Sequence, residues 1–207
     1  MKDELKIIID YVEGRLDIND VKMLIINDKH LQKMLKKPFD FNYIAYARYN
    51  FNIYEYLRSE CHFDRNWDTV VTRCVVYLEF TRLLDFKKIK YNKDFTKYVD
   101  DYDYLLRIQP SWLDIRDDQG IFDKIIAEAP ADVSKTKRIA WGKARLKELF
   151  RYDKTYPRWV QSPEWPIVNG KPLVFSHQSK EKKDDERVFY YFYDPDTKEE
   201  TVVEQMY

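Results

Sequence analysis

Cysteine and histidine are the side chains that most readily bind zinc or act as nucleophile and base, and this chain has few of them. The useful set is Cys61, His62, Cys74 and His177. Zinc sites need three or four such ligands at recognisable spacing, and no CxxC or HxxxH pair occurs. Cys61 and His177 could pair as nucleophile and base, but no oxyanion-hole motif accompanies them. We therefore expect no metal site, and we interpret Cys74, on an apolar helical stripe, as a small core residue.

Paired aspartates are the second candidate for chemistry. Residues 98–101 read Tyr-Val-Asp-Asp, which resembles the metal-binding tetrapeptide of reverse-transcriptase palms. That chemistry needs a hairpin tip, whereas the pattern here predicts a helix over residues 95–108. Magnesium also needs convergent carboxylates, and spacing alone does not show convergence. We expect a solvated acidic band, or one that faces a basic surface, made of Asp100, Asp101, Asp103, Asp114, Asp117 and Asp118.

Loops that cradle phosphates are not predicted. The chain has four glycines and neither a GxxxxGK[ST] nor a GxGxxG motif, which excludes the usual nucleotide-dependent enzymes. We accordingly expect no cofactor. General acid–base catalysis by Glu164, Glu204 or a tyrosine needs no motif. An unrecognised hydrolase or transferase therefore stays as a third hypothesis, and it predicts a pocket that gathers Glu164, His177 and a tyrosine.

Basic residues dominate residues 134–154, where we predict a helix that begins after Ser134. A helix of this kind could lie on a phosphate backbone. The candidate anion-binding or nucleic-acid surface is Lys137, Arg138, Lys143, Arg145 and Lys147. The simpler interpretation is a solvated face, or one that pairs with the acidic band. The whole chain balances 36 basic against 36 acidic residues, so it is not a general polyanion-binding protein.

Composition bounds the class of protein. A hydrophobic content of 44% with 16% aromatic residues is far from the disordered signature. No apolar run approaches the roughly 20 residues of a transmembrane helix. The first residues, Met-Lys-Asp-Glu, do not begin a signal peptide. Two cysteines are too few for a disulfide scaffold, so we expect a cytoplasmic location.

Hydrophobic periodicity predicts an α+β fold in which residues 1–155 are helical. Asp17 and Asp28 are the expected caps of the second and third helices, and Asn66 or Asp64 the expected cap of the strongest helix, which begins near Trp67. Residues 39–51 give no clear pattern. The remaining predicted helices cover residues 2–13, 53–59, 95–108 and 121–128.

Alternation predicts a three-stranded antiparallel meander that packs on the helices. Its strands are residues 172–177, 188–193 and 201–207, with a turn at 194–198 and a charged, solvated loop at 179–187. In the first strand we expect Phe175 and His177 on one face and Val174 and Gln178 on the other. Residues 156–207 are taken as one unit after the helical region 1–155.

Residues 156–171 form a connector rich in proline and tryptophan. A residue that precedes proline avoids the α region, so the connector is expected to be extended, with Asn169-Gly170 as a tight turn. The simplest interpretation is a stiff segment that fixes the meander to the helices. Alternatively, rigid aromatics beside polar side chains suit a protein interface. The candidate interaction residues are Trp159, Gln161, Glu164, Trp165, His177 and Gln178.

One string in this region resembles a known pattern. Trp165-Pro166, Gly170, Pro172-Leu173, Phe175 and Gln178 match a WP-x3-G-x-PL-x-F-x-x-Q segment of uncharacterised bacterial proteins. Some of those proteins are similar to immunity proteins of polymorphic toxin systems. The resemblance covers residues 156–207 and implies binding to a protein partner.

Together these observations favour a non-enzymatic, cytoplasmic protein-binding protein, in the manner of an immunity or inhibitor protein that binds a bacterial effector. The alternative is a nucleic-acid-associated accessory or regulatory protein that uses the basic helix. The sequence predicts neither the partner nor the oligomeric state.

Overall fold

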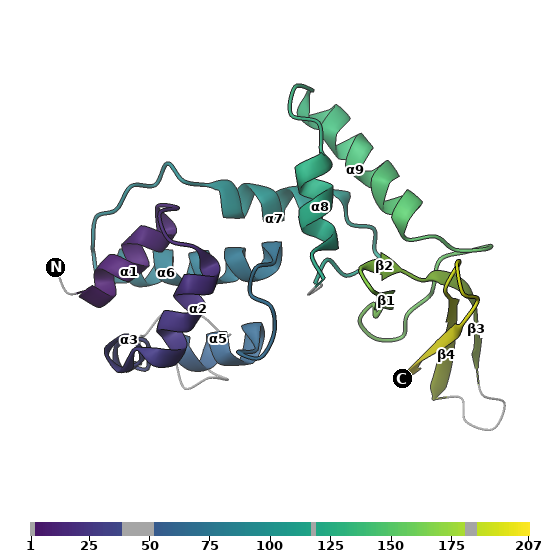
Figure 1. The fold of residues 1–207 in the computed structure, drawn as a ribbon, viewed down its shortest axis with the longest axis horizontal. Helices are drawn as coiled ribbons and strands as arrows, with labels where there is room; N and C mark the ends of the chain where they lie inside the picture. The colour runs from purple at the N-terminus through teal and green to yellow at the C-terminus, as the bar shows by residue number, and fades with distance from the viewer. Residues whose placement is uncertain (1–2, 39–51, 117–118, 181–185) are drawn as a thin grey trace. The chain divides into compact units, whose positions relative to one another are not determined.

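The computed structural model describes residues 3–38, 52–116, 119–180 and 186–207. The predicted α+β class is confirmed: helices come first and an antiparallel three-stranded sheet comes last (Figure 1). The chain forms two compact units, residues 1–102 and 103–207. The change from helix to strand, near residue 155, and the division into units therefore fall at different places. The expectations for residues 39–51, for Asp117 and Asp118, and for the centre of the charged loop lie outside the described residues.

Unit 1 is built from helices whose caps are local in sequence. The Asp17 side chain accepts a hydrogen bond from Asn19 N, and the Asp28 side chain accepts from His30 N and Leu31 N, as predicted. Asn52 caps the next helix through Glu55 N. The helices are α1 (Asp3–Val12), α2 (Ile18–Asn27), α3 (Lys29–Leu35), α5 (Ile53–Cys61), α6 (Val70–Phe86) and the start of α7 (Lys97–Ile108).

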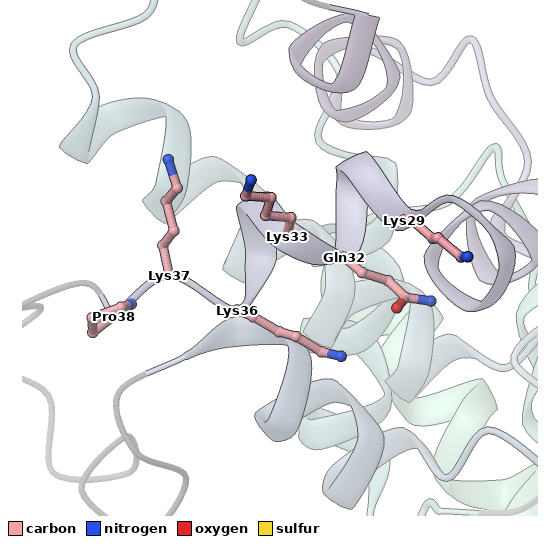
Figure 2. A pocket seen from close by; sticks show the side chains of 6 residues that line it. All are labelled: Lys29, Gln32, Lys33, Lys36, Lys37 and Pro38. Atoms are coloured by element: carbon pink, nitrogen blue, oxygen red, sulfur yellow. The ribbon is translucent and has the colours of Figure 1, made fainter.

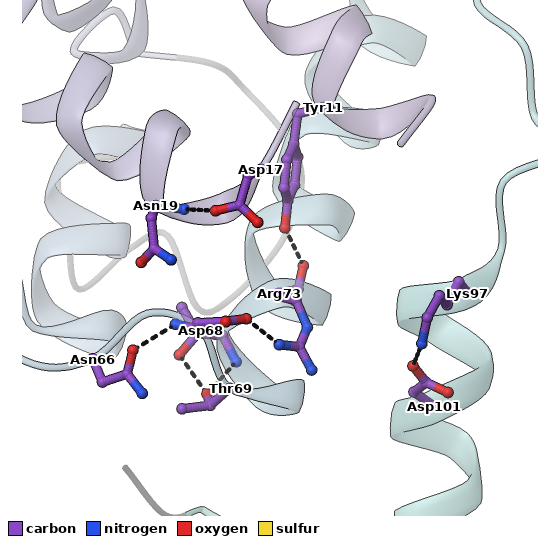
Figure 3. A network of polar contacts seen from close by, with 10 residues as sticks. Tyr11, Asp17, Asn19, Asn66, Asp68, Thr69, Arg73, Lys97 and Asp101 are labelled. Carbon is purple, nitrogen blue, oxygen red and sulfur yellow. Dashed lines mark hydrogen bonds and ion pairs between the residues drawn. The ribbon is translucent and has the colours of Figure 1, made fainter. Parts of the chain in front are cut away.

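The predicted start of the strongest helix is wrong. Thr69, not Asn66 or Asp64, caps α6, and its hydroxyl accepts from Thr72 N. Asn66 instead accepts from Asp68 N at 2.9 Å and closes a turn before the helix (Figure 3). Trp67 precedes α6 and is fully buried, with its Nε1 donating to His62 O at 3.2 Å. The apolar pattern therefore made the predicted helix begin too early, at Trp67, which is buried but lies before the first residue of α6.

The core of unit 1 lies between α1 and α6. The Tyr11 hydroxyl donates to Arg73 O at 2.9 Å, which ties the two helices together (Figure 3). Its ring meets Phe80 at 5.8 Å and Tyr98 at 5.4 Å between centroids. Tyr98 belongs to the Tyr-Val-Asp-Asp tetrapeptide, which lies within α7 as the periodicity predicted.

Unit 2 joins two helices to the predicted meander. Its sheet has the order β3-β4-β5, with both pairs antiparallel. Asn169 and Gly170 adopt positive φ and turn a small hairpin, β1–β2, whose two short strands were not predicted. After the end of α7 the elements are α8 (Ile121–Glu128), α9 (Lys135–Leu149), β1 (Ile167–Val168), β2 (Lys171–Pro172), β3 (Val174–Lys180), β4 (Arg187–Tyr193) and β5 (Glu200–Met206).

Aromatic rings pack the meander on the helices, as predicted. Phe150, which ends α9, lies 6.0 Å from Phe122 of α8 and 5.5 Å from Trp165 between ring centroids. Trp165 in turn contacts Phe175 of β3 and Phe192 of β4. One continuous aromatic core therefore reaches from α8 to the sheet.

Gly142 marks the closest approach of α9 to the end of α7. A Cβ at this position would overlap the Tyr104 hydroxyl and lie 2.8 Å from Ile108 Cγ2. Replacing glycine by alanine inside a helix ordinarily adds about 1 kcal/mol of stability. For Gly142→Ala we expect the opposite sign, a loss of about 1–3 kcal/mol, because the methyl group overpacks the contact. Urea denaturation of this variant beside Ala144→Gly, an exposed change on the same helix, checks the prediction, and a stabilised Gly142→Ala would contradict it.

Candidate functional site

The connector lies across one face of the meander, and its backbone is bonded by side chains of the strands. Arg158 N donates to Gln178 Oε1 of β3 at 2.8 Å. Val160 N donates to the Tyr190 hydroxyl of β4 at 2.9 Å, and that hydroxyl donates to Arg158 O at 3.0 Å. Backbone polar groups removed from water need partners, and here side chains supply them.

The last strand continues this pattern. Gln161 N donates to Gln205 Oε1 at 3.1 Å, and Gln205 Nε2 donates to Ser162 O at 2.8 Å. Gln161 Nε2 reaches Met206 O at 2.7 Å. Gln205 is only 2% exposed, so its amide serves the fold and not the solvent. All three strands therefore hold the connector through side chain-to-backbone hydrogen bonds.

Both tryptophans of the connector are committed to internal contacts. Trp159 lies 4.4 Å from Tyr190 between ring centroids and donates its Nε1 to Trp112 O at 2.9 Å. Trp165 is buried and donates its Nε1 to Leu173 O at 2.8 Å. With Gln161 and Gln178, these predicted interaction residues take part in the packing of unit 2 itself.

His177 and Glu164 are exposed, and they complete the predicted set. The expectation that His177 shares a face with Phe175 is wrong. A β-bulge shifts the register between these residues, so that Phe175 pairs with Phe192 and His177 pairs with Tyr191. Successive residues of β4 point to opposite faces, which places Phe175 in the core and His177 on the other side of the sheet.

This other side is called the open face here. It carries Phe189, Tyr191 and Tyr193 of β4. Beside them lie Val202 and Met206 of β5, and these two side chains are each 49% exposed. The His177 ring stacks on Tyr191 with centroids 4.4 Å apart and planes 2° from parallel. The Tyr193 hydroxyl donates to Asp153 Oδ1 at 2.9 Å. The register places Arg187, Glu200 and Glu204 on the same face, so the open face mixes aromatic and apolar side chains with charged ones.

The two edges of the sheet differ. The edge of β3 is occupied near Phe175, whose N donates to Arg151 O at 2.9 Å and whose O accepts from Asp153 N at 3.0 Å. Of the described segments, none pairs as a strand with the outer edge of β5. The register of β4 and β5 directs the backbone N–H and C=O groups of Glu200, Val202 and Glu204 away from β4. Sequence alternation could suggest the faces, but it carries no signal for which edge is left unpaired.

The basic helix contributes fewer free cations than its sequence suggested. Lys137, Lys143 and Lys147 are exposed on α9. The Arg138 guanidinium lies 4.5 Å from the centre of the Tyr104 ring. Arg145 donates to Glu128 at 3.0 Å and to Glu148 at 3.3 Å. The arginines of this candidate surface are thus in contact with unit 2 itself, and the lysines are the groups available to an anion.

The remaining candidates for chemistry are placed without forming a centre. Within the described part of the chain, no group of three or more His, Cys, Asp or Glu side chains could hold a metal ion. Asp100 accepts from the Thr96 hydroxyl at 2.6 Å, and Asp101 pairs with Lys97. Cys61 is buried in unit 1, and burial raises the pKa of its thiol to about 12, so the thiol is protonated at neutral pH.

None of the helices in the described ranges combines the length and apolarity needed to cross a membrane. Comparison of the chain with models of known protein families, with curated proteins and with solved structures finds no match.

Proposed function

We propose that this chain is a non-enzymatic protein-binding protein whose partner adds an extended segment to the outer edge of β5. The observation that carries the proposal is the contrast between the two edges of the sheet. A strand edge with outward N–H and C=O groups is a template for an additional strand. The neighbouring open face offers side-chain contacts, because Val202 and Met206 lie in β5 itself and half of each is exposed.

The charge of the edge favours a basic partner segment. Glu199, Glu200 and Glu204 lie along β5 or directly before it, and Arg187 Nη1 meets Glu204 Oε1 at 3.3 Å. Opposite charges on paired strands contribute about 0.2–1 kcal/mol each, and like charges cost free energy. Two copies of β5 would bring these glutamates together, whereas a partner with lysine or arginine at alternate positions would complement them.

We further propose that the biological role is that of an immunity or inhibitor protein that binds a bacterial effector. A cytoplasmic immunity or inhibitor protein acts by binding an effector tightly, and it needs a rigid surface to do so. The connector supplies rigidity to the meander through hydrogen bonds to all three strands. The resemblance of residues 156–207 to proteins similar to immunity proteins points the same way.

A proline at Val202 tests the edge directly. Its N–H points away from β4, so Val202→Pro removes an outward donor and leaves the ladder with β4 intact. The immobilised wild type, Val202→Pro and Val202→Thr are exposed to a nuclease-treated lysate of the cells that encode the chain. We expect one protein near stoichiometry on wild type and Val202→Thr, and at least about tenfold less on Val202→Pro, since the edge supplies backbone hydrogen bonds.

Two results would contradict the proposal. Equal recovery on Val202→Pro would show that the partner does not use the edge of β5. A concentration-dependent dimer in sedimentation velocity, abolished by Val202→Pro, would show that a second copy occupies it. Thermal unfolding of the wild type and of both variants establishes that unit 2 is folded in each protein.

A further inference from the structure

A second surface lies on α3 in unit 1, where the chain reads Lys-His-Leu-Gln-Lys-Met-Leu-Lys-Lys over residues 29–37. Leu31 and Leu35 are fully buried, so the opposite side of the helix faces outward. An open hollow of about 420 Å³ lies on this side, and Figure 2 shows the side chains that line it. The described residues that line it are Lys29, Gln32, Lys33, Lys36, Lys37 and Pro38.

The described residues that line this hollow do not balance its positive charge. Four of the six are lysines and none is a carboxylate. The nearest acidic residue in sequence, Asp28, is used as the cap of α3 through His30 N and Leu31 N. Lys36 lies over the Tyr54 ring with its Nζ 4.2 Å from the centroid, an arrangement that holds this ammonium at the surface.

Helix stability alone does not account for these lysines. Cations near the end of a helix interact favourably with its dipole, which accounts for Lys33, Lys36 and Lys37. Lys29 lies in the first turn, where the dipole disfavours a cation. Lys29 and Lys33 are also an i,i+4 pair of like charge on α3, which destabilises the helix. A bound anion would convert this repulsion into attraction.

We propose that the α3 hollow binds the phosphate backbone of nucleic acid. With a rise of about 1.5 Å per residue, Lys29 and Lys33 are about 6 Å apart along the helix axis, and the stripe continues through Lys36 and Lys37. Charges spread along a shallow surface suit successive phosphates of a strand, whereas a single phosphate is usually enclosed by backbone N–H groups. Binding is independent of sequence, because lysine ammonium groups contact phosphates and read no base edge. This surface shares no residue with the β5 edge, so either proposal can fail alone.

The test uses fluorescence anisotropy of the full chain with a labelled oligodeoxythymidine of about 12 nucleotides, in about 50–200 mM salt. For the wild type we expect log K to fall with log salt concentration at a slope of about −3, since four phosphate contacts on a single strand contribute about −0.7 each. Lys29→Glu with Lys33→Glu reverses two lysines of the hollow. The comparison variant is Lys143→Glu with Lys147→Glu, an exposed i,i+4 pair of the competing candidate surface on α9, with the same change of net charge.

We expect the α3 variant to bind at least about tenfold more weakly at the lowest salt and the α9 variant to bind as the wild type does. Circular dichroism verifies that both variants are folded. No binding by the wild type at the lowest salt overturns the proposal. Weaker binding by the α9 variant alone would place the site on α9. Equally weakened binding by both variants would show that binding depends on the net charge of the chain and not on the α3 surface. If inorganic polyphosphate displaces the labelled strand as effectively as unlabelled oligonucleotide does at the same concentration of phosphate groups, the assignment of the ligand as nucleic acid is wrong.

Discussion

Trp165→Ala is expected to lower the free energy of unfolding of unit 2 by about 3–5 kcal/mol, the usual cost of emptying a large aromatic site in a core. Trp165 is 8% exposed and lies where the helices meet the sheet. Its ring contacts Trp112, Phe150, Phe175 and Phe192, with centroids 5.4–6.4 Å apart. Removing it disconnects the aromatic core that runs from α8 to β4.

The measurement is amide hydrogen exchange in the full chain, because it localises the loss. Exchange in β3 and β4 is expected to accelerate by two to three orders of magnitude or more, since each 1.4 kcal/mol is about a factor of ten. Trp165→Phe serves as the graded control. It keeps a ring and loses the Nε1–H that bonds Leu173 O, which we expect to cost about 1–3 kcal/mol. Unchanged exchange in β4 of Trp165→Ala would contradict the role given to this residue.

The helices of this chain were predictable because their ends depend on neighbours in the sequence. Asp17, Asp28 and Ser134 each bond a backbone N–H two or three residues ahead, as a cap must. The turn after β4 is local in the same sense, since Asp194 accepts from Asp196 N and Thr197 N. Before α6 the prediction failed, because several residues there can cap a helix: Asp64 or Asn66 was expected to do so, and Thr69 does.

The predicted faces of β3 failed for a reason that lies outside the strand. Period-two alternation assumes one residue on each strand per step of the ladder. The bulge after Phe175 adds a residue on one strand only, and every side chain beyond it changes face. At the edge of β3 that faces away from β4, Phe175 N donates to Arg151 O and Phe175 O accepts from Asp153 N. No pattern within β3 reveals these contacts.

The same limit applies to the candidate site. The sequence proposed the aromatic and amide residues of the connector as interaction residues, but such a composition suits internal packing as well as an interface. The contacts of Trp159 and Gln178 show the internal role, and only the fold shows that no segment in the described ranges pairs with the outer edge of β5. The α3 lysines carry a sequence signal that was overlooked, since positions 29, 33, 36 and 37 recur at the spacing of one helical face.

Glu79 presents a different kind of exception, a carboxylate placed in the apolar core of unit 1. It lies on α6 between Tyr77 and Phe80 and is 2% exposed. One oxygen pairs with Arg82, and the other, Oε2, has no hydrogen-bond partner in the described structure. Burial raises the pKa of Glu79 from 4.5 to about 7, against the opposing effect of Arg82.

The sign of the resulting pH dependence follows from proton binding. Between about pH 4.5 and 7 the folded state holds a proton on Glu79 that the unfolded state has released. The contribution of Glu79 to stability is therefore greatest below pH 4.5 and declines as the pH rises to 7. Above pH 7 the charged carboxylate is buried at its full cost. A pKa change of this size corresponds to about 3 kcal/mol, because each pKa unit is worth about 1.4 kcal/mol.

Glu79→Gln removes the titration, so the variant is expected to gain about 3 kcal/mol relative to the wild type between pH 4 and pH 8. Urea denaturation of both proteins at each pH gives this difference, in which the titration of all other groups cancels. Glu79→Met is the second arm. Its absolute stability differs, since methionine makes no hydrogen bond to Arg82, but its difference from the wild type must rise over the same pH range. A difference that stays flat from pH 4 to pH 8 in both variants would show that the pKa of Glu79 is the same in the folded and unfolded states, and that the effect of Arg82 cancels the effect of burial.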